Sequence, residues 1–343
     1  MHILFFCPVN PERPTGGVLV IFRCVEMLRS QGFQASVVAL PLDQTQREPG
    51  WFDSSSPVIS WAEACQLPPK DCVFVLPEDF SMAWHQDTVR AENKVLEIGQ
   101  ANLMVFAQNR RDMYRNFYSQ WPKLVGREQT VLHQPGFLGV LCVSDLEQTY
   151  WKTIYPDIEV WCKPNSIDTS QFQPAPEREN IALFLGKPAI LNEARHTLLA
   201  LRHSDLAKNW RFLNLHGKNH REVASLMSKA DLFMSFGTVE SFGLAAAEAM
   251  ASGCIVIGYH GGVPEEFFNP LWSYPVRPLD HLGYLQAFQQ LNNDRTRTPE
   301  LVEQRRQLGR AHIERNFSPK REAQALQQIF EVVVQRARSR RTA

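Results

Sequence analysis

Short apolar runs alternate with longer amphipathic stretches along the first half of the chain. The stretch Val18–Ser30 stops before Gly32, which is typical of a helix and its C-terminal boundary. The apolar runs are continuous rather than alternating, a pattern typical of parallel strands that are covered on both faces. Five such runs of strand length, rich in Val, Phe and Leu, occupy residues 2–7, 34–40, 72–78, 103–109 and 140–144.

A second set of strand-like runs follows at residues 181–186, 210–217, 231–236 and 254–261. The segment 163–180 between the two sets is polar, contains three prolines and has no hydrophobic period. We therefore predict an α/β protein with two doubly wound domains. The predicted boundaries are 1–163 for the first domain, 164–316 for the second, and 317–343 for a C-terminal helix that returns to the first domain and ends in a basic tail.

Composition narrows the class of protein. The 343 residues are 44% hydrophobic and 21% charged, so each domain can bury a core and disorder is not expected. Lys plus Arg and Asp plus Glu both number 36, which gives no support for nucleic-acid binding. No apolar run reaches the length of a membrane span, and the N-terminus does not resemble a signal peptide.

The seven cysteines are scattered without CxxC or Cys/His spacing, so neither a disulfide framework nor a zinc site is predicted. A reducing, cytoplasmic environment fits this usage best. The tail Arg336–Arg341 is interpreted as a solvated end, and contact with an anionic membrane surface is the alternative interpretation.

Gly16 and Gly17 lie between the first predicted strand and the helix expected to start near Val18. Paired glycines let backbone approach a ligand closely, and a helix N-terminus offers N–H groups to an anion. A plain strand-to-helix loop is the alternative. The loop is not GxGxxG, and no GxxxxGK[ST] occurs, so a dinucleotide dehydrogenase is disfavoured.

The segment 240–253, ESFGLAAAEAMASG, predicts a turn, a helix and a C-terminal glycine after the strand at 231–236. Glu240 lies in the turn, and Glu248 lies inside the helix among alanines. A buried carboxylate is costly without a partner, so Glu248 should have one. We predict that the N–H groups of Phe242, Gly243 and Leu244 meet phosphate oxygens, that Glu248 binds a ribose diol and that Glu240 binds sugar hydroxyls.

These residues resemble a known family. The segment 240–266 is similar to the E-x7-E signature of retaining glycosyltransferases of the GT-B fold, family 4, including its GG-PE turn at Gly261, Gly262, Pro264 and Glu265. The linker PNSIDTSQFQP at 164–174 resembles the family's connection into the nucleotide domain. The segment 140–151 resembles the end of the family's first domain, and the Gly16–Gly17 loop stands where the family has its glycine loop.

The resemblance implies two Rossmann-like domains facing across a cleft, and retaining transfer of a hexose-type sugar from a nucleotide-diphosphate donor. It implies a hydroxyl acceptor on a glycan, a lipid-linked glycan or a polysaccharide, and a place in polysaccharide biosynthesis at the cytoplasmic side. The family holds the diphosphate with two basic side chains. Lys187 and Arg195 occupy the corresponding positions in reversed order, and with Glu240 they form the predicted catalytic group.

In the first domain, Gln108 and Asn109 stand where many members carry a histidine. They and Glu78, at another strand end, are predicted to contact sugar or acceptor hydroxyls, and His133 is a weak candidate for the missing histidine. The chain contains no Asp-x-Asp, so we expect neither a metal nor a cofactor. Two other functions remain open: a sugar-nucleotide epimerase with the GT-B fold, and a non-catalytic sugar-nucleotide-binding protein.

Overall fold

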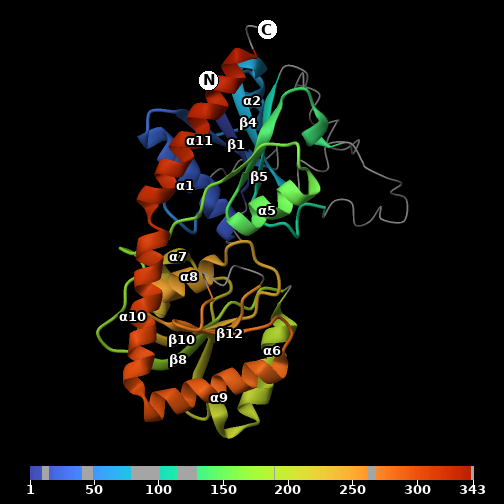
Figure 1. The fold of residues 1–343 in the computed structure, drawn as a ribbon. Helices are drawn as coiled ribbons and strands as arrows, with labels where there is room; N and C mark the ends of the chain where they lie inside the picture. The colour runs from blue at the N-terminus through green and yellow to red at the C-terminus, as the bar shows by residue number, and fades with distance from the viewer. Residues whose placement is uncertain are drawn as a thin grey trace. The chain divides into compact units, whose positions relative to one another are not determined.

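The computed structural model describes residues 1–9, 15–40, 49–78, 101–114, 130–188, 190–261 and 268–340. The chain divides into two compact units (Figure 1). Unit 1 comprises Met1–Pro164 and Glu322–Ala343, and unit 2 comprises Asn165–Arg321. Of the residues described, no helix is both long and apolar enough to cross a bilayer.

Unit 1 is built on a seven-stranded parallel sheet with the order β3-β2-β1-β4-β5-β6-β7. Its strands are β1 (His2–Pro8), β2 (Gln34–Leu40), β3 (Val58–Ile59), β4 (Cys72–Pro77), β5 (Asn102–Ala107), β6 (Phe137–Cys142) and β7 (Val160–Cys162). Its helices are α1 (Gly16–Ser30), α2 (Trp61–Cys65), η1 (Pro69–Asp71), η4 (Val131–His133), α5 (Asp145–Ile154) and most of α11 (Pro319–Ser339).

Neighbouring residues of β1 show how both faces of this sheet are covered. The ring centroids of Phe5 and Phe330, in α11, lie 5.8 Å apart. Those of Phe6 and Trp61, in α2, lie 5.4 Å apart. Successive side chains of a strand point to opposite faces, so both faces need apolar residues. Burial of both faces therefore explains why the apolar runs in the sequence are continuous. A buried ion pair between Lys163 and Glu322 joins the segment after β7 to α11.

Unit 2 is built on a five-stranded parallel sheet with the order β12-β11-β10-β8-β9. The strands are β8 (Glu179–Phe184), β9 (Arg211–Asn214), β10 (Ala230–Ser235), β11 (Ile255–Tyr259) and β12 (Ser273–Val276). The helices are α6 (Leu191–Arg202), η5 (Asp205–Ala207), α7 (His220–Lys229), α8 (Leu244–Ala251), α9 (His281–Arg297) and α10 (Pro299–Asn316).

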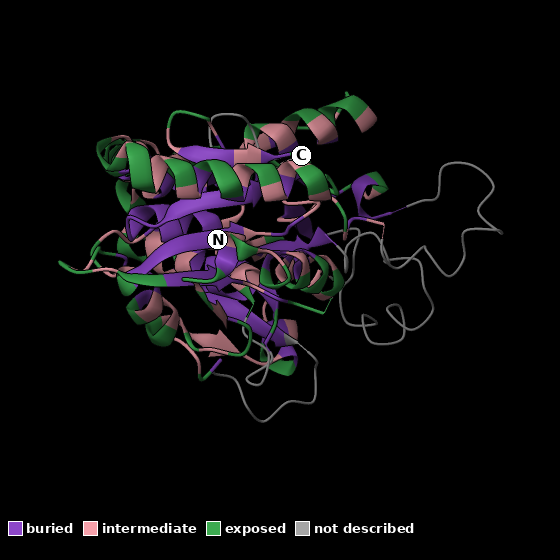
Figure 2. Cartoon of the chain, turned by 90° about the horizontal axis from the view of Figure 1, so that it is seen from below, coloured by how far each residue is buried: buried purple, intermediate pink, exposed green. Residues whose placement is uncertain are grey.

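Unit 2 has three layers. Helix α8 contacts α7 and α10 on one side of the sheet, and α9 contacts α6 on the other; α9 also contacts α10, which follows it in the chain (Figure 1). The strands are mostly buried, and the helices expose their outer faces (Figure 2). Two parallel sheets, each covered by helices, confirm the predicted α/β class.

Some element boundaries differ from those expected. Helix α1 begins at Gly16 rather than near Val18, so the two glycines form its first residues instead of a loop before it. Strand β9 is confined to Arg211–Asn214 of the predicted run 210–217. The strands β3, β7 and β12 were not predicted.

Candidate functional site

The strand order of unit 2 indicates where a ligand would bind. Strands β9 and β10 lie on opposite sides of β8, so the order reverses between β8 and β10. In open parallel sheets, ligands bind beyond the carboxyl ends of the strands at such a switch point. Lys187 follows β8, and the segment Glu240–Gly243 follows β10. Both predicted groups therefore flank the switch point.

The start of α8 has a specific backbone geometry. Gly243 is its N-cap, with φ 81° and ψ 51°, and no side chain caps the helix. The left-handed conformation costs L-residues free energy, which explains the glycine. The preceding Phe242 is buried, and its ring centroid lies 5.2 Å from that of Phe317. This anchor fixes the helix start, where the first N–H groups have no partner within the helix.

Glu240 is framed by two glycines. Its N–H donates to the carbonyl of Gly261 at 2.8 Å. A Cβ added to Gly261 would lie 2.9 Å from the Cβ of Glu240, and one added to Gly237 would lie 2.5 Å from its Oε1. Any side chain at either glycine would therefore displace Glu240.

Glu248 has the partner that its surroundings demand. It is 7% exposed, and its Oε1 lies 3.2 Å from Nε2 of His220, the first residue of α7. Nδ1 of the same ring lies 3.1 Å from Nε2 of Gln171, in the linker that precedes β8. Sequence reasoning predicted a partner for Glu248 but did not identify His220 or Gln171.

Three arginines hold the other end of α8. Arg178 donates to the carbonyl of Ser252 at 2.8 Å, Arg306 to that of Gly253 at 2.9 Å, and Arg310 to that of Ala251. These cations satisfy carbonyls at the negative end of the helix dipole. Arg306 also pairs with the buried carboxylate of Asp231. Sequence reasoning missed this set, because its members come from outside the helix.

Lys187 and Arg195 belong to the loop and helix that follow β8, and both are exposed. Neither has a polar side-chain partner within the described residues. Two hydrogen bonds hold described residues of this loop: the N–H of Gly186 donates to Oδ1 of Asn214 at 2.9 Å, and that of Ile190 donates to the Lys187 carbonyl at 3.0 Å. Both cations are thus available to an anion.

A second group of polar side chains joins α6, the end of β11 and the start of α9. His281 Nε2 lies 3.6 Å from Oε2 of Glu193 in α6, and its Nδ1 lies 3.4 Å from the hydroxyl of Tyr259, the last residue of β11. Burial raises the pKa of Tyr259 to about 12, with smaller contributions from the carboxylates of Glu193 and Asp280. Tyr259 therefore stays a neutral phenol near pH 7. Sequence reasoning did not select this group.

In unit 1, the strand order reverses at β1, between β2 and β4. Four residues predicted from the sequence meet at the carboxyl ends of β1, β4 and β5. Gln108 Nε2 donates to the Gly17 carbonyl at 3.2 Å, and the N–H of Asn109 donates to the buried Glu78 carboxylate at 2.7 Å. Gly16 adjoins this group as the first residue of α1.

His133 does not join these residues. It lies in η4, before the start of β6, and its Nδ1 accepts the N–H of Thr130 at 3.0 Å. Asp79, Gly262, Pro264 and Glu265 lie outside the described residues. Across the described ranges, no group of three or more His, Cys, Asp or Glu side chains is arranged to hold a metal ion.

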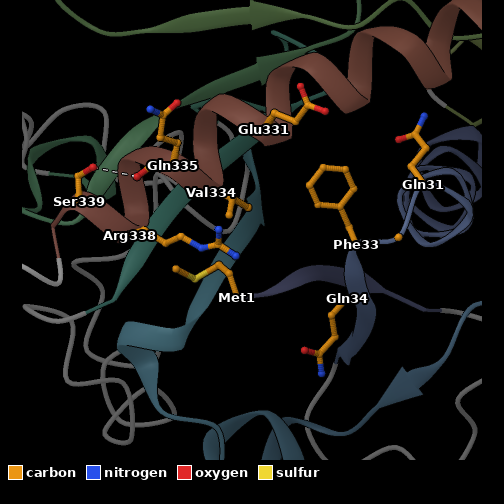
Figure 3. A pocket seen from close by; sticks show the side chains of 10 residues that line it. Met1, Gln31, Phe33, Gln34, Glu331, Val334, Gln335, Arg338 and Ser339 are labelled. Atoms are coloured by element: carbon orange, nitrogen blue, oxygen red, sulfur yellow. Dashed lines mark hydrogen bonds between the residues drawn. The ribbon is translucent and has the colours of Figure 1, made fainter.

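A pocket of about 580 Å³ lies elsewhere in unit 1, between the turn that joins α1 to β2 and helix α11 (Figure 3). Phe33 lines it from the turn, Gln34 from the start of β2, and Val334 and Arg338 from α11. Gln34 begins β2, so this pocket adjoins the amino ends of the strands. None of the predicted site residues lines it.

Comparisons with known proteins are consistent with this geometry. Residues 200–272 match the family model Glycosyl transferases group 1. A protein of Actinobacillus pleuropneumoniae serotype 7 (strain AP76) named alpha-1,6-glucosyltransferase is 29% identical over 274 residues, which cover 75% of this chain and 72% of that protein.

Solved structures share the fold over almost the whole chain. Sucrose-phosphate synthase from Thermosynechococcus elongatus matches with a TM-score of 0.65 at 15% identity, covering 97% of this chain and 99% of that one. Anabaena HepE in complex with UDP-glucose matches with a TM-score of 0.65 at 13% identity, covering 97% and 100%.

The fold and the match together define a class. The chain has two Rossmann-like units of the GT-B type, as predicted, and its residues 200–272 match the glycosyl transferases group 1 model. The matched segment contains His220, Glu240 and Glu248, so it includes the α8 part of the candidate site. The family match and the named relative support a glycosyl transferase.

Proposed function

We propose that this protein is a retaining family 4 glycosyltransferase that moves a hexose-type sugar from a nucleoside-diphosphate donor to a hydroxyl of a glycan, lipid-linked or polysaccharide acceptor. One observation carries the proposal: the start of α8 lies at the switch point of unit 2, with one carboxylate on either side of it. The relative named as a glucosyltransferase and the complex of HepE with UDP-glucose support it.

In the proposal, the donor diphosphate binds at the N-terminus of α8. The N–H groups around Phe242, Gly243 and Leu244 and the positive end of the helix dipole favour an anion there. Glu248 accepts hydrogen bonds from the ribose diol. Its single partner among the described residues is His220, and a carboxylate can accept about four hydrogen bonds, so acceptor capacity remains.

Lys187 and Arg195 neutralise the leaving nucleoside diphosphate, since both side chains are exposed and have no polar partner in the part of the chain that is described. No metal and no cofactor takes part in the proposal. Glu240 orients the donor sugar by accepting hydrogen bonds from the hydroxyls of that sugar. The acceptor hydroxyl attacks the anomeric carbon from the face that the diphosphate leaves.

Gln108, Asn109 and Glu78 bind the acceptor or the transferred sugar, with Gly16 and Gly17 beside them. We place the enzyme in polysaccharide biosynthesis at the cytoplasmic side of the membrane. Arg338 and Arg340, exposed at the end of α11 and just beyond it, support contact with an anionic membrane surface.

Glu248→Ala is the test of the donor site. Titration calorimetry with UDP-, GDP-, ADP- and dTDP-sugars first identifies the donor, and the variant should then bind it about tenfold more weakly, as expected for losing a hydrogen bond to a charged group. Glu300→Ala removes an exposed glutamate from the first turn of α10 and should leave affinity unchanged. Unchanged affinity in Glu248→Ala would remove the ribose assignment.

Turnover separates the alternatives. Incubation of donor with an acceptor pool should release nucleoside diphosphate and glycosylated product. Conversion of the donor without any acceptor would indicate an epimerase instead. Binding without any turnover would indicate a non-catalytic sugar-nucleotide-binding protein.

A further inference from the structure

The carboxylate assigned to the ribose is held by a histidine from another helix. His220 and Glu248 are 28 positions apart, and both side chains are about nine-tenths buried. A carboxylate among apolar groups is costly unless hydrogen bonds compensate its desolvation. The contact between His220 Nε2 and Glu248 Oε1 is the compensating bond that the described residues provide.

The second nitrogen of the ring is also engaged. Nδ1 lies 3.1 Å from the side-chain amide nitrogen of Gln171, and the ring makes a T-shaped contact with Phe172, with the ring centroids 5.2 Å apart. In the tautomer with its proton on Nε2, the ring accepts from Gln171 and donates to Glu248, so both contacts are satisfied at once. The ring therefore has a defined orientation toward Glu248.

Local hydrogen bonds fix the backbone positions of His220 and Gln171. Asn219 caps α7 by accepting the N–H of Glu222 at 2.9 Å, and Glu222 accepts the N–H of Asn219 in return, which sets His220 as the first helical residue. Asp168 Oδ1 accepts from the N–H of Ser170 at 2.9 Å and so forms the turn that leads to Gln171.

We propose that His220 is a positioning residue for the donor nucleotide, with Gln171 supporting it. By holding Oε1 of Glu248, it leaves Oε2 to accept from the ribose hydroxyls. The ligand chemistry is therefore a ribonucleoside diphosphate rather than its 2′-deoxy counterpart. This inference rests on the proposed function, since it acts through the ribose role of Glu248.

The test measures preference for ribose. Calorimetry compares UDP, GDP and ADP with their 2′-deoxy forms, and the wild-type protein should bind at least one ribonucleotide about tenfold more tightly than its deoxy form. His220→Leu should reduce this preference by weakening ribonucleotide binding more than deoxynucleotide binding, which keeps only the 3′-hydroxyl contact. The double variant with Glu248→Ala should show no further loss, because both changes remove one interaction.

Three further variants complete the design. His203→Leu removes an exposed histidine at the end of α6 and should keep the wild-type preference. His220→Gln offers an amide N–H in place of Nε2–H and should recover part of the preference, which a merely space-filling role for His220 would not predict. If His220→Leu does not fold, His220→Gln and Gln171→Leu provide the same comparison, with intermediate preference expected from both.

The outcomes distinguish a failure of the positioning role of His220 from a failure of the ribose role of Glu248. If Glu248→Ala loses the ribose preference and the His220 and Gln171 variants keep it, the positioning role is overturned and the proposed function stands. If the wild-type protein shows no ribose preference, or Glu248→Ala retains it, the ribose role of Glu248 fails and the positioning role fails with it.

Discussion

Gly261 offers a direct way to disturb Glu240 without touching its side-chain chemistry. Its φ is +61°, and a Cβ placed there would lie 2.9 Å from both Cβ and Cγ of Glu240 and 3.0 Å from its backbone nitrogen. Carbon atoms do not approach so closely without repulsion, so Glu240 or the backbone must move. The perturbation is therefore Gly261→Ala.

Two costs combine in this variant. The left-handed conformation costs an L-residue about 1–2 kcal/mol, and overpacking adds about 1–3 kcal/mol. Gly32→Ala is the matched control, since Gly32 has φ +87° and no atom within 4 Å of an added Cβ. It should lose only the conformational part, about 1–2 kcal/mol. Each kcal/mol should lower Tm by about 2–4 °C.

The assay pairs thermal unfolding with sugar transfer. Gly32→Ala should unfold earlier but keep full kcat/KM at temperatures below its transition. Gly261→Ala should lose kcat/KM by about tenfold or more at those temperatures, because a displacement of about 1 Å at a positioned group has effects of this order. Equal kcat/KM in the two variants would refute the idea that the glycine frame positions a functional Glu240.

Three further predictions concern charge. Arg306→Met should lower the free energy of unfolding by about 3 kcal/mol in urea, because it leaves the buried Asp231 carboxylate with only Arg295 as an ion-pair partner among the described residues; a loss below 1 kcal/mol would contradict this. Burial lowers the pKa of His312 from 6.5, so the unfolded chain binds its proton first as pH falls, and stability should decrease below pH 6.5. His312→Gln should flatten that slope in unfolding curves between pH 5 and 7, and an unchanged slope would rule this source out. Lys187→Ala and Arg195→Ala should each change the unfolding free energy by less than about 0.5 kcal/mol yet reduce kcat, and unaltered kinetics in both would remove their assignment.

The strands of both sheets could be predicted where they are long and buried on both faces. Strands β1 and β10 form continuous apolar runs in the sequence because helices cover both faces of their sheets. Strand β3 has two residues and β12 contains Pro275, so neither gives a run that periodicity can detect. Helices α9 and α10 mix polar and apolar positions without a clear stripe, and the sequence did not predict them.

The local structure of the α8 segment could be predicted because its residues are close in the chain. The segment from Glu240 to Gly253 contains its own turn, helix start and helix end, so local rules were sufficient. His220 is one of ten histidines, and its contact with Glu248 depends on how α7 packs beside α8. The arginine contacts at the end of α8 depend on α10 in the same way. Pairings of this kind arise from tertiary packing, which no spacing in the sequence encodes.

Helix α8 is held at both ends before any ligand arrives, by Phe242 against Phe317 at its start and by the three arginines at its finish. A ligand that binds to such a helix has little conformational entropy to remove, so more of the contact energy remains as affinity. Slow hydrogen exchange of the α8 amides in the empty protein would reveal this rigidity. Changes at Arg178 or Arg310, which bond α8 at its far end as well as the carbonyls of Ala230 and Phe172, should then weaken nucleotide binding by loosening the helix.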